Sequence, residues 1–284
     1  QVGAIGIFVS RGDRTTGTRL FGRQRLADDA DGTIRDDAVF LVASITKPIV
    51  AMSALLLVEA GQVRLDDRVS RYLPEFGNNG KNGIRIRHLL THTSGLPDML
   101  AENQQLREAG AGLEEFVAGT CRVEPDFQPG RGVQYQSMGF AILGEVIARV
   151  SGQGCADWLN SQVIEPLGLK STCLGASDDW FDGDRPLVER IAEIRTPPEQ
   201  EGVDWNWNLR YWRQLGAPWG GLLTTPRELA VIGRMMLEGG RGVISPASVA
   251  AATCNQLSAM ADVPETDRRC KPWGLGWRLN WPAT

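Results

Sequence analysis

The order of its residue patterns constrains the fold of this chain most, because strand patterns stand at both ends and helical patterns fill the middle. Near the start, residues 4–9 form an apolar run followed by a turn, and residues 19–22 can return beside it as the second strand of a hairpin. Near the end, residues 274–281 alternate as a strand does. This layout predicts an α/β (α+β) fold whose sheet carries a helical insert, with any site at the junction of the two parts.

The middle of the chain contains several helical segments with recognisable ends. The clearest spans residues 46–60, with Pro48 in its first turn, mostly apolar positions after it, and Gly61 beyond its end. Further helices are predicted at residues 113–118, 138–150, 156–164 and 225–238, and another begins at Ser245. Residues 1–60 and 200–284 are assigned to a sheet subdomain, and residues 61–199 to a mainly helical subdomain.

The charge balance narrows the classes of partner. The 284 residues include 30 Lys and Arg against 34 Asp and Glu, so the net charge is 30 − 34 = −4. This balance gives no basic surface of the kind that binds nucleic acids or anionic membranes. The longest apolar run, residues 49–58, is too short to span a bilayer. We therefore expect a small-molecule substrate, no nucleic acid and no membrane span, while the oligomeric state is left open.

Histidine and cysteine contents exclude several kinds of site. The two histidines are His88 and His92, which rules out a three-histidine metal site. The five cysteines are scattered, and none forms the Cys-x-x-Cys spacing of zinc ribbons or thioredoxin-like proteins. Their odd number argues against a disulfide framework and favours a reducing compartment, such as the cytoplasm. The localisation itself is left open.

The first chemically informative spacing is Ser44-x-x-Lys47, at the start of the helix predicted over residues 46–60. Residues three apart share one face of a helical turn. A buried lysine with a lowered pKa can remove the hydroxyl proton, which makes Ser44 an activated nucleophile. The helix N-terminus favours the negative charge that develops nearby. The spacing alone is weak, because an N-cap serine beside an exposed lysine gives the same pattern.

Six segments in fixed order resemble the serine β-lactamase and penicillin-binding-protein superfamily, and most closely its class C-like branch, which also contains esterases and D-amino-acid peptidases. They are residues 40–48, 87–97, 135–152, 166–169, 220–230 and 273–277. The resemblance covers most of the chain. It implies a β-lactamase-like antiparallel sheet flanked by helices, with an all-helical insert. It also implies a serine hydrolase that acts through an acyl-enzyme, with no metal and no cofactor.

The resemblance implies roles for individual residues. Ser44 would be acylated, with Lys47 and Tyr135 sharing the proton transfers. A phenol near pKa 10 serves as a base only where cations favour the phenolate, and Lys47 is the expected cation. The backbone N–H of Ser44 would form an oxyanion hole with a second N–H from a strand edge. The predicted substrate-binding residues are Ser137, Trp219, Gly220 and Gly221.

Two departures from the family pattern affect what can be expected. Ser137 stands where the branch usually carries Asn, and one hydroxyl cannot make the paired contacts of an amide. The third family motif, Lys-Thr-Gly or His-x-Gly on a core strand, is expected some tens of residues after Trp277, whereas the sequence ends at Thr284. The chain also begins on a strand, without Met or the basic segment of a signal peptide. We therefore expect a fragment of a longer protein, with activity reduced by truncation.

Several functional alternatives stay open. The substrate is expected to be a small carboxylic ester, with a β-lactam or a D-amino-acid peptide or amide as alternatives. The aromatic stretch over residues 205–219 either walls an acyl pocket or packs an insert onto the sheet. A catalytically impaired fragment or a binding protein of the same fold is the remaining alternative. A Ser-His-Asp hydrolase is excluded, because the chain has no Gly-x-Ser-x-Gly segment and no histidine after His92.

Overall fold

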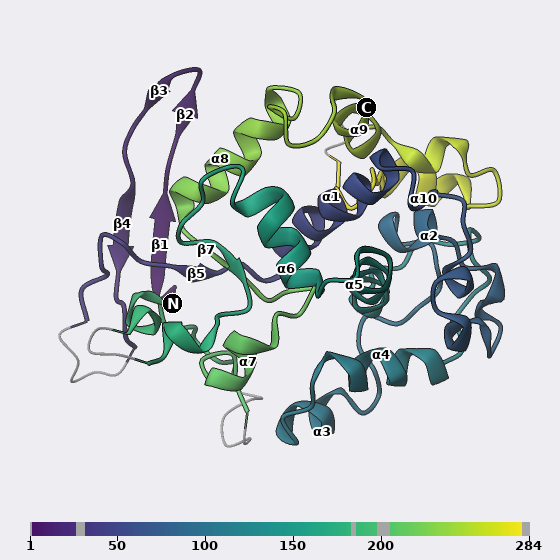
Figure 1. The fold of residues 1–284 in the computed structure, drawn as a ribbon, viewed down its shortest axis with the longest axis horizontal. Coiled ribbons are helices and arrows are strands. Elements are labelled where there is room, and N and C mark those ends of the chain that lie inside the picture. Colours follow the sequence, from purple (N-terminus) through teal and green to yellow (C-terminus); the bar gives the residue numbers. More distant parts are fainter. Residues whose placement is uncertain (1, 27–31, 183–185, 198–204, 280–284) are drawn as a thin grey trace.

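The structure is a computed structural model, which describes residues 2–26, 32–182, 186–197 and 205–279. A three-stranded antiparallel sheet in the order β5-β7-β6 lies between the N-terminal hairpin and the helices (Figure 1). Its strands are β5 (Phe40–Leu41), β7 (Leu222–Thr224) and β6 (Cys173–Leu174). Mixed strands and helices confirm the predicted α/β class.

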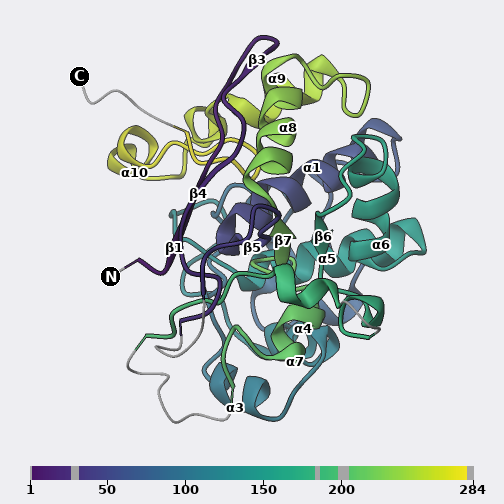
Figure 2. The same cartoon turned by 90° about the vertical axis from the view of Figure 1, so that its left-hand side faces the viewer.

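The predicted N-terminal hairpin is confirmed. Strand β1 (Ala4–Ile7) pairs antiparallel with β4 (Arg19–Gly22), and its tip is formed by β2 (Ser10–Arg11) and β3 (Arg14–Thr15). The hairpin runs beside α8 (Pro226–Leu237) in both ribbon views (Figures 1 and 2). An ion pair of 2.8 Å joins Asp13, near the tip, to Arg234 on that helix.

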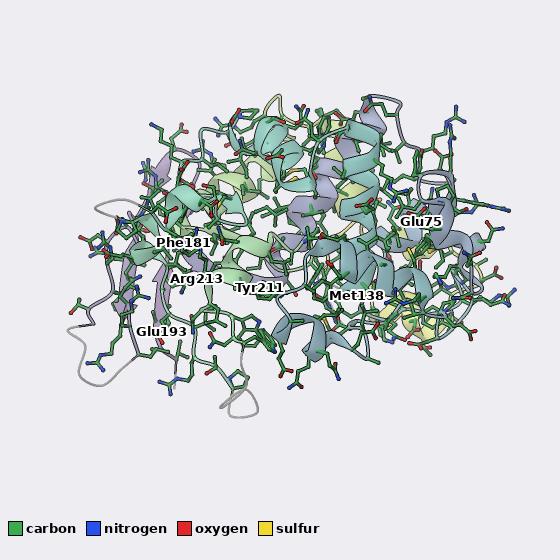
Figure 3. The ribbon with its side chains drawn as sticks, turned by 60° about the horizontal axis from the view of Figure 1, so that its bottom comes forward. Glu75, Met138, Phe181, Glu193, Tyr211 and Arg213 are labelled. Carbon is green, nitrogen blue, oxygen red and sulfur yellow. The ribbon has the colours of Figure 1, made fainter. Side chains whose placement is uncertain are left out.

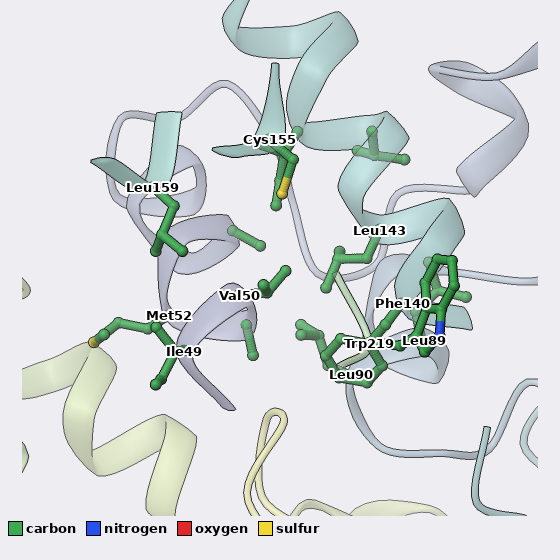
Figure 4. Close-up of a cluster of buried hydrophobic side chains, with 14 of the residues drawn as sticks. Ile49, Val50, Met52, Leu89, Leu90, Phe140, Leu143, Cys155, Leu159 and Trp219 are labelled. Carbon is green, nitrogen blue, oxygen red and sulfur yellow. The ribbon is translucent and has the colours of Figure 1, made fainter. Parts of the chain in front are cut away.

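The core is built around α1 (Thr46–Glu59), which packs against α5 (Met138–Ser151). Helix α1 is apolar on nearly all of its faces, so it must be covered by other elements on all sides. Side chains from α1, α2 (Ile86–Leu90), α5, α6 (Cys155–Leu159) and the segment before β7 meet in one cluster, in which Trp219 lies beside α5 (Figure 4). This cluster fixes the position of the first turn of α1, which contains Lys47 and directly follows the turn that carries Ser44.

The helices predicted over residues 113–118, 138–150, 156–164 and 225–238 and from Ser245 are present, whereas those at residues 86–90, 103–108, 210–215 and 265–270 were not predicted. Thr225 caps α8, since its hydroxyl accepts the Glu228 N–H, and Ser245 caps α9 in the same way. The helix predicted over residues 156–164 is α6 followed by a π-helical turn, Asn160–Ile164. The other helices are α2 (Ile86–Leu90), α3 (Asn103–Glu108), α4 (Leu113–Arg122), α6 (Cys155–Leu159), α7 (Arg210–Leu215), α9 (Pro246–Thr253) and α10 (Glu265–Cys270).

The prediction of a strand over residues 274–281 is wrong for residues 274–279, and the last two residues of that range lie outside the described residues. A single bridge joins Trp273 to Arg278, and the Gly274 N–H donates to the Trp277 carbonyl, so the chain folds back on itself. Gly276 makes the turn with a φ of 81°. A side chain there would collide with Ala51 of α1, at 2.2 Å from its Cβ. The apolar alternation therefore reflects a turn packed on α1 and not a sheet edge.

The division into two subdomains stays a prediction. Strand β6 belongs to the range assigned to the helical part, yet it pairs with β7 in the central sheet. Ile191 likewise forms a bridge with Val39, just before β5. Among the described segments, no helix has both the length and the apolar character needed to cross a membrane.

Candidate active site

Ser44 lies in a single 3₁₀ turn, Ala43–Ile45, between β5 and α1. Ala43 has a φ of 46°, a left-handed conformation that costs energy for a residue with a Cβ. Thr46 holds this turn: its hydroxyl donates to the Ala43 carbonyl at 2.6 Å and accepts the Leu222 N–H of β7 at 3.0 Å. The turn is thus attached to the sheet, and it leaves Ser44 exposed.

Lys47 is buried directly behind Ser44, with 2% of its surface exposed. Its Nζ lies 3.1 Å from Ser44 Oγ and donates to the Trp219 carbonyl at 2.8 Å. Burial lowers the pKa of Lys47 to about 8, although the charge of Asp98 raises it. About a tenth of the molecules then carry a neutral amine at pH 7. A neutral Lys47 is placed to accept the Ser44 hydroxyl proton.

Tyr135 reaches the same place from the loop before α5. The Lys47 Nζ lies 4.6 Å from the centroid of the Tyr135 ring, over its face. Burial raises the pKa of Tyr135, and the hydrogen bond with Ser44 only partly offsets this. This differs from the expectation that Lys47 favours a phenolate, because the cation faces the ring. At neutral pH Tyr135 is therefore a phenol that can donate a proton.

His92 and the residues around it pack against Tyr135 and fix its position. The His92 ring stacks on the Tyr135 ring with centroids 4.7 Å apart, and its Nδ1 accepts the Gln136 N–H at 3.0 Å. The Gln136 side chain donates to the carbonyls of His88 and Leu89. Burial, followed by the charge of Lys47, lowers the pKa of His92 to about 3, so the ring stays neutral. The sequence assigned no role to His92. The one indication was that His92 lies within residues 87–97, one of the segments that resemble the family.

Ser137 and Asp98 form a pair next to Tyr135. The Ser137 hydroxyl donates to Asp98 Oδ1 at 2.6 Å. Because a hydroxyl has one proton, Ser137 faces any other group as an acceptor while this bond exists. Sequence reasoning missed Asp98, whose only signal was its position directly after the block 87–97.

A cavity of about 340 Å³ opens beside Ser44. It brings together five of the seven residues that the sequence assigned to the site, while Lys47 lies behind Ser44. The lining residues are Leu41, Ala43, Ser44, Asp98, Met99, Arg107, Tyr135, Ser137, Ile194, Trp207, Trp212, Trp219 and Gly220.

Gly221 is not among the residues that line this cavity, although the sequence placed it there. Its N–H donates to the Ala217 carbonyl, and its carbonyl accepts the Gly175 N–H. A Cβ at this position would come within 2.5 Å of the Ala217 backbone nitrogen. Gly221 therefore allows a close turn before β7, and a role for it in substrate binding stays a prediction.

The aromatic stretch forms one wall of the cavity. Trp207, Trp212 and Trp219 line it, and Trp205 packs against both Trp207 and Trp212 at 6.2 and 6.0 Å between centroids. The Trp219 ring also packs on Phe116 of α4 at 5.3 Å. The rings thus pack on one another and present an apolar surface toward Ser44.

The arrangement brings a serine hydroxyl, a buried lysine amine and a tyrosine phenol within reach of one another. Ser44, Lys47 and Tyr135 suit nucleophilic attack on an acyl carbon, with proton transfer to and from the attacked group. In the described part of the chain, no group of three or more His, Cys, Asp or Glu side chains is arranged to hold a metal ion.

Comparison with known proteins agrees with this geometry. A family model described as "Beta-lactamase" matches residues 1–283. Esterase EstB of Burkholderia gladioli is 37% identical over 228 residues, which is 71% of this chain and 56% of that protein. Penicillin-binding protein 4 of Amycolatopsis lactamdurans is 31% identical over 258 residues, covering 87% of this chain and 64% of the relative. The chain thus spans less than two thirds of the length of these two relatives.

A solved structure supports the same fold. A penicillin-binding-protein homologue from Caulobacter crescentus superimposes with a TM-score of 0.78 at 23% identity, covering 100% of this chain and 77% of that one. At this identity the likeness concerns the fold alone. It agrees with the sheet flanked by helices that the sequence predicted.

Proposed function

The chain belongs to the beta-lactamase family, and we propose that it is a serine hydrolase that cleaves small carboxylic esters through an acyl-enzyme on Ser44. One observation carries this proposal: the Lys47 Nζ lies 3.1 Å from Ser44 Oγ in a buried position that lowers its pKa to about 8. A base with a pKa near the working pH is the most effective partner for a serine nucleophile. The similarity to Esterase EstB supports esters among the possible substrates.

The proposed reaction has two halves. Ser44 Oγ attacks the ester carbonyl carbon while neutral Lys47 takes the hydroxyl proton, and a tetrahedral intermediate forms. The C–O bond to the alcohol then breaks, and the alcohol leaves with a proton supplied by the Lys47 ammonium or the Tyr135 phenol. In the second half, water attacks the acyl carbon and gives a proton to whichever of Lys47 and Tyr135 protonated the alcohol. The bond between the acyl carbon and Ser44 Oγ then breaks, Ser44 Oγ takes a proton from the Lys47 ammonium, and the acid leaves.

One polar group of the cavity, Ser137, argues against substrates that need a hydrogen-bond donor for their amide. Ser137 donates its single proton to Asp98, so it offers no donor to a substrate amide. Much of the wall is tryptophan, which suits an apolar acyl or alcohol group. Esters are intrinsically activated acyl donors and need fewer polar contacts for attack.

A fluorophosphonate probe tests the nucleophile directly. Ser44 Oγ displaces fluoride at phosphorus, and the resulting mass increase can be mapped to one peptide by mass spectrometry. We expect one adduct, on Ser44, and none in Ser44→Ala. Lys47→Met should slow labelling strongly, because it removes the base.

Lys81 offers a matched control for that variant. It is another fully buried lysine with a lowered pKa, but it lies outside the cavity and its Nζ donates to the Val123 carbonyl. Lys81→Met should therefore label at the rate of the unsubstituted protein. A folded protein that gains no adduct, or gains one at another serine, would refute the proposal. Labelled protein that turns over nitrocefin but no ester would instead identify a β-lactamase.

A further inference from the structure

The geometry points to Arg107 as a carboxylate-binding residue of this cavity, so that the substrate carries a carboxylate in addition to its scissile bond. Turnover of such a substrate rests on the proposed function, whereas binding of the carboxylate does not. The residue lies on α3, far from the segments that carry Ser44, Lys47 and Tyr135 in the sequence.

Arg107 is a buried cation whose guanidinium is poorly satisfied by the described residues. It is 5% exposed and lines the cavity. Its Nε has no hydrogen-bond partner, and its Nη2 makes only a 3.6 Å contact with Met99 Sδ, a weak acceptor. No carboxylate of the described residues lies within ion-pair distance of the guanidinium. A buried charge without a counter-ion is costly, so an anion that enters the cavity gains by pairing with it.

Two tryptophans fix the guanidinium without covering it. Its central carbon lies 4.4 Å from the ring centroids of both Trp205 and Trp212, and those centroids are 6.0 Å apart. The directions from the guanidinium to the two rings are therefore about a right angle apart, so the rings do not enclose it from opposite sides, and Arg107 still lines the cavity. A guanidinium held in this way can donate two parallel hydrogen bonds to one carboxylate.

The charge of Arg107 is retained at neutral pH. Burial lowers its pKa to about 10, against the opposing effects of Tyr211 and Asp98. Asp98 is the other charged residue of the lining, and Lys47 adds positive charge behind Ser44. The cavity therefore has no excess of negative charge that would repel a carboxylate.

The wall that holds Arg107 is tied to the rest of the protein. The Tyr211 hydroxyl donates to the Ala111 carbonyl at 2.8 Å, which joins α7 to the loop after α3. In the view of Figure 3, Tyr211 lies between Arg213 and Met138, the first residue of α5. This bond keeps Trp212, the next residue of α7, against Arg107. The anion site is consequently formed before a ligand arrives.

The cavity volume limits the size of the ligand. About 340 Å³ is at the small end of the range of ligand pockets, roughly 300–1,000 Å³. Ser44 and Arg107 line this one small space, so the carboxylate and the scissile carbonyl are separated by a few bonds. A monoester of a short dicarboxylic acid fits this description, with the carboxylate on the acyl side. A short ester of a hydroxy acid carries it on the alcohol side.

Paired substrates test the inference. Mono-p-nitrophenyl adipate and p-nitrophenyl hexanoate have acyl chains of the same length and differ in the terminal carboxylate. Arg107→Gln should lower kcat/KM for the adipate ester about 10- to 100-fold, mainly through KM, and change it little for the hexanoate ester. The butyrate ester of 4-hydroxybenzoate against phenyl butyrate tests the alcohol side in the same way. Selective loss in either pair supports the inference and identifies the side.

Arg213 provides the control for losing a buried arginine. It is also 5% exposed with an unpartnered Nε, but it does not line the cavity. Arg213→Gln should affect the anionic and neutral esters equally. Arg107→Lys, which retains the charge, should restore part of the preference for the anionic ester.

Binding without turnover separates this inference from the proposed function. Adipate should bind Ser44→Ala in calorimetry and bind Ser44→Ala/Arg107→Gln about 10- to 100-fold more weakly. If no ester is cleaved, the proposed function fails, and the adipate titration alone decides this inference. Equal adipate binding by the two variants, or equal loss of both members of each ester pair in Arg107→Gln, would overturn it.

Discussion

Replacing Lys47 with Met should stabilise the folded protein while abolishing acylation. Lys47 is 2% exposed and, at neutral pH, mostly charged, so folding has to remove a charge from water. Met has a similar length and no charge, and the surrounding residues of α1 are buried and apolar. The substitution therefore removes the base and, with it, an unfavourable contribution to the free energy of folding.

The size of the effect follows from the pKa of Lys47. Burial lowers it from 10.5 to about 8, and each pKa unit corresponds to about 1.36 kcal/mol, so charge burial destabilises the fold by about 3 kcal/mol at pH 7. Lys47→Met also leaves the Trp219 carbonyl without its donor, which costs about 1–2 kcal/mol. The net stabilisation expected at pH 7 is about 1–2 kcal/mol.

The pH dependence is the more specific test, because the lost hydrogen bond does not titrate. Between pH 8 and 10.5 the unfolded chain holds the Lys47 proton more tightly than the folded protein, so the stability of the unsubstituted protein rises with pH relative to Lys47→Met. The advantage of the variant should therefore shrink by about 2 kcal/mol between pH 7 and 9.5.

Urea unfolding of both proteins at pH 6, 7, 8, 9 and 9.5 measures this difference. Each titration gives the free energy of unfolding by linear extrapolation. The reasoning would be refuted if the difference between the two proteins were constant over this range. It would also be refuted if Lys47→Met lost stability by more than the hydrogen bond to Trp219 accounts for.

Three further predictions concern the same site. The rate of Ser44 acylation should rise with pH and level off above about pH 8, because neutral Lys47 accumulates; a flat profile of fluorophosphonate labelling between pH 6 and 9 would contradict this. Asp98→Asn should move the midpoint of that profile to lower pH, since the Asp98 charge raises the pKa of Lys47; an upward shift would show that Asp98 acts otherwise. His92→Ala should destabilise the protein by about 2–4 kcal/mol in urea unfolding, because it leaves a void beneath Tyr135 and an unpaired Gln136 N–H. Unchanged stability would show that His92 does not support Tyr135.

The hairpin and the longer helices, such as α1, α5 and α8, could be predicted from the sequence because their signals are local, whereas the short helices α2, α3, α7 and α10 were not predicted. Pro48 and Gly61 bracket α1, and the side chain of Thr225 caps α8 three residues from its partner. Each of these signals involves residues that are close in sequence. Such elements can therefore be predicted without knowing which other elements pack against them.

The elements that were missed depend on distant contacts. Strand β6 has two residues, too few for an alternating pattern, and it exists because β7 lies beside it. The turn at Gly276 alternates like a strand, yet its conformation is set by the close approach of Ala51 on α1. Neither outcome is encoded within a window of neighbouring residues.

The residues of the site also fall into two groups, those with a local sequence signal and those without one. Ser44 and Lys47 could be identified because their spacing lies within one helical turn, and Tyr135 because its motif resembles the family's. The additional residues in the site are His92, which supports Tyr135, and Asp98 and Arg107, which line the cavity. Their significance comes from partners in other segments, so no sequence spacing reveals it.

Three energetically unfavourable features lie around the cavity beside Ser44. Ala43 is held in a left-handed conformation beside the nucleophile, Lys47 is a buried charge behind it, and Arg107 is a buried cation whose Nε has no partner. Each costs stability in isolation, and the α1–α5 core, together with the bond from Thr46 to β7, holds them in place. Relieving one of these features by substitution should therefore raise stability and lower turnover or substrate preference. Weakening the support, as in His92→Ala, should lower both. Opposite effects on stability and turnover would indicate that these residues are kept for catalysis. A protein that has the same fold but no activity would show only the effects on stability.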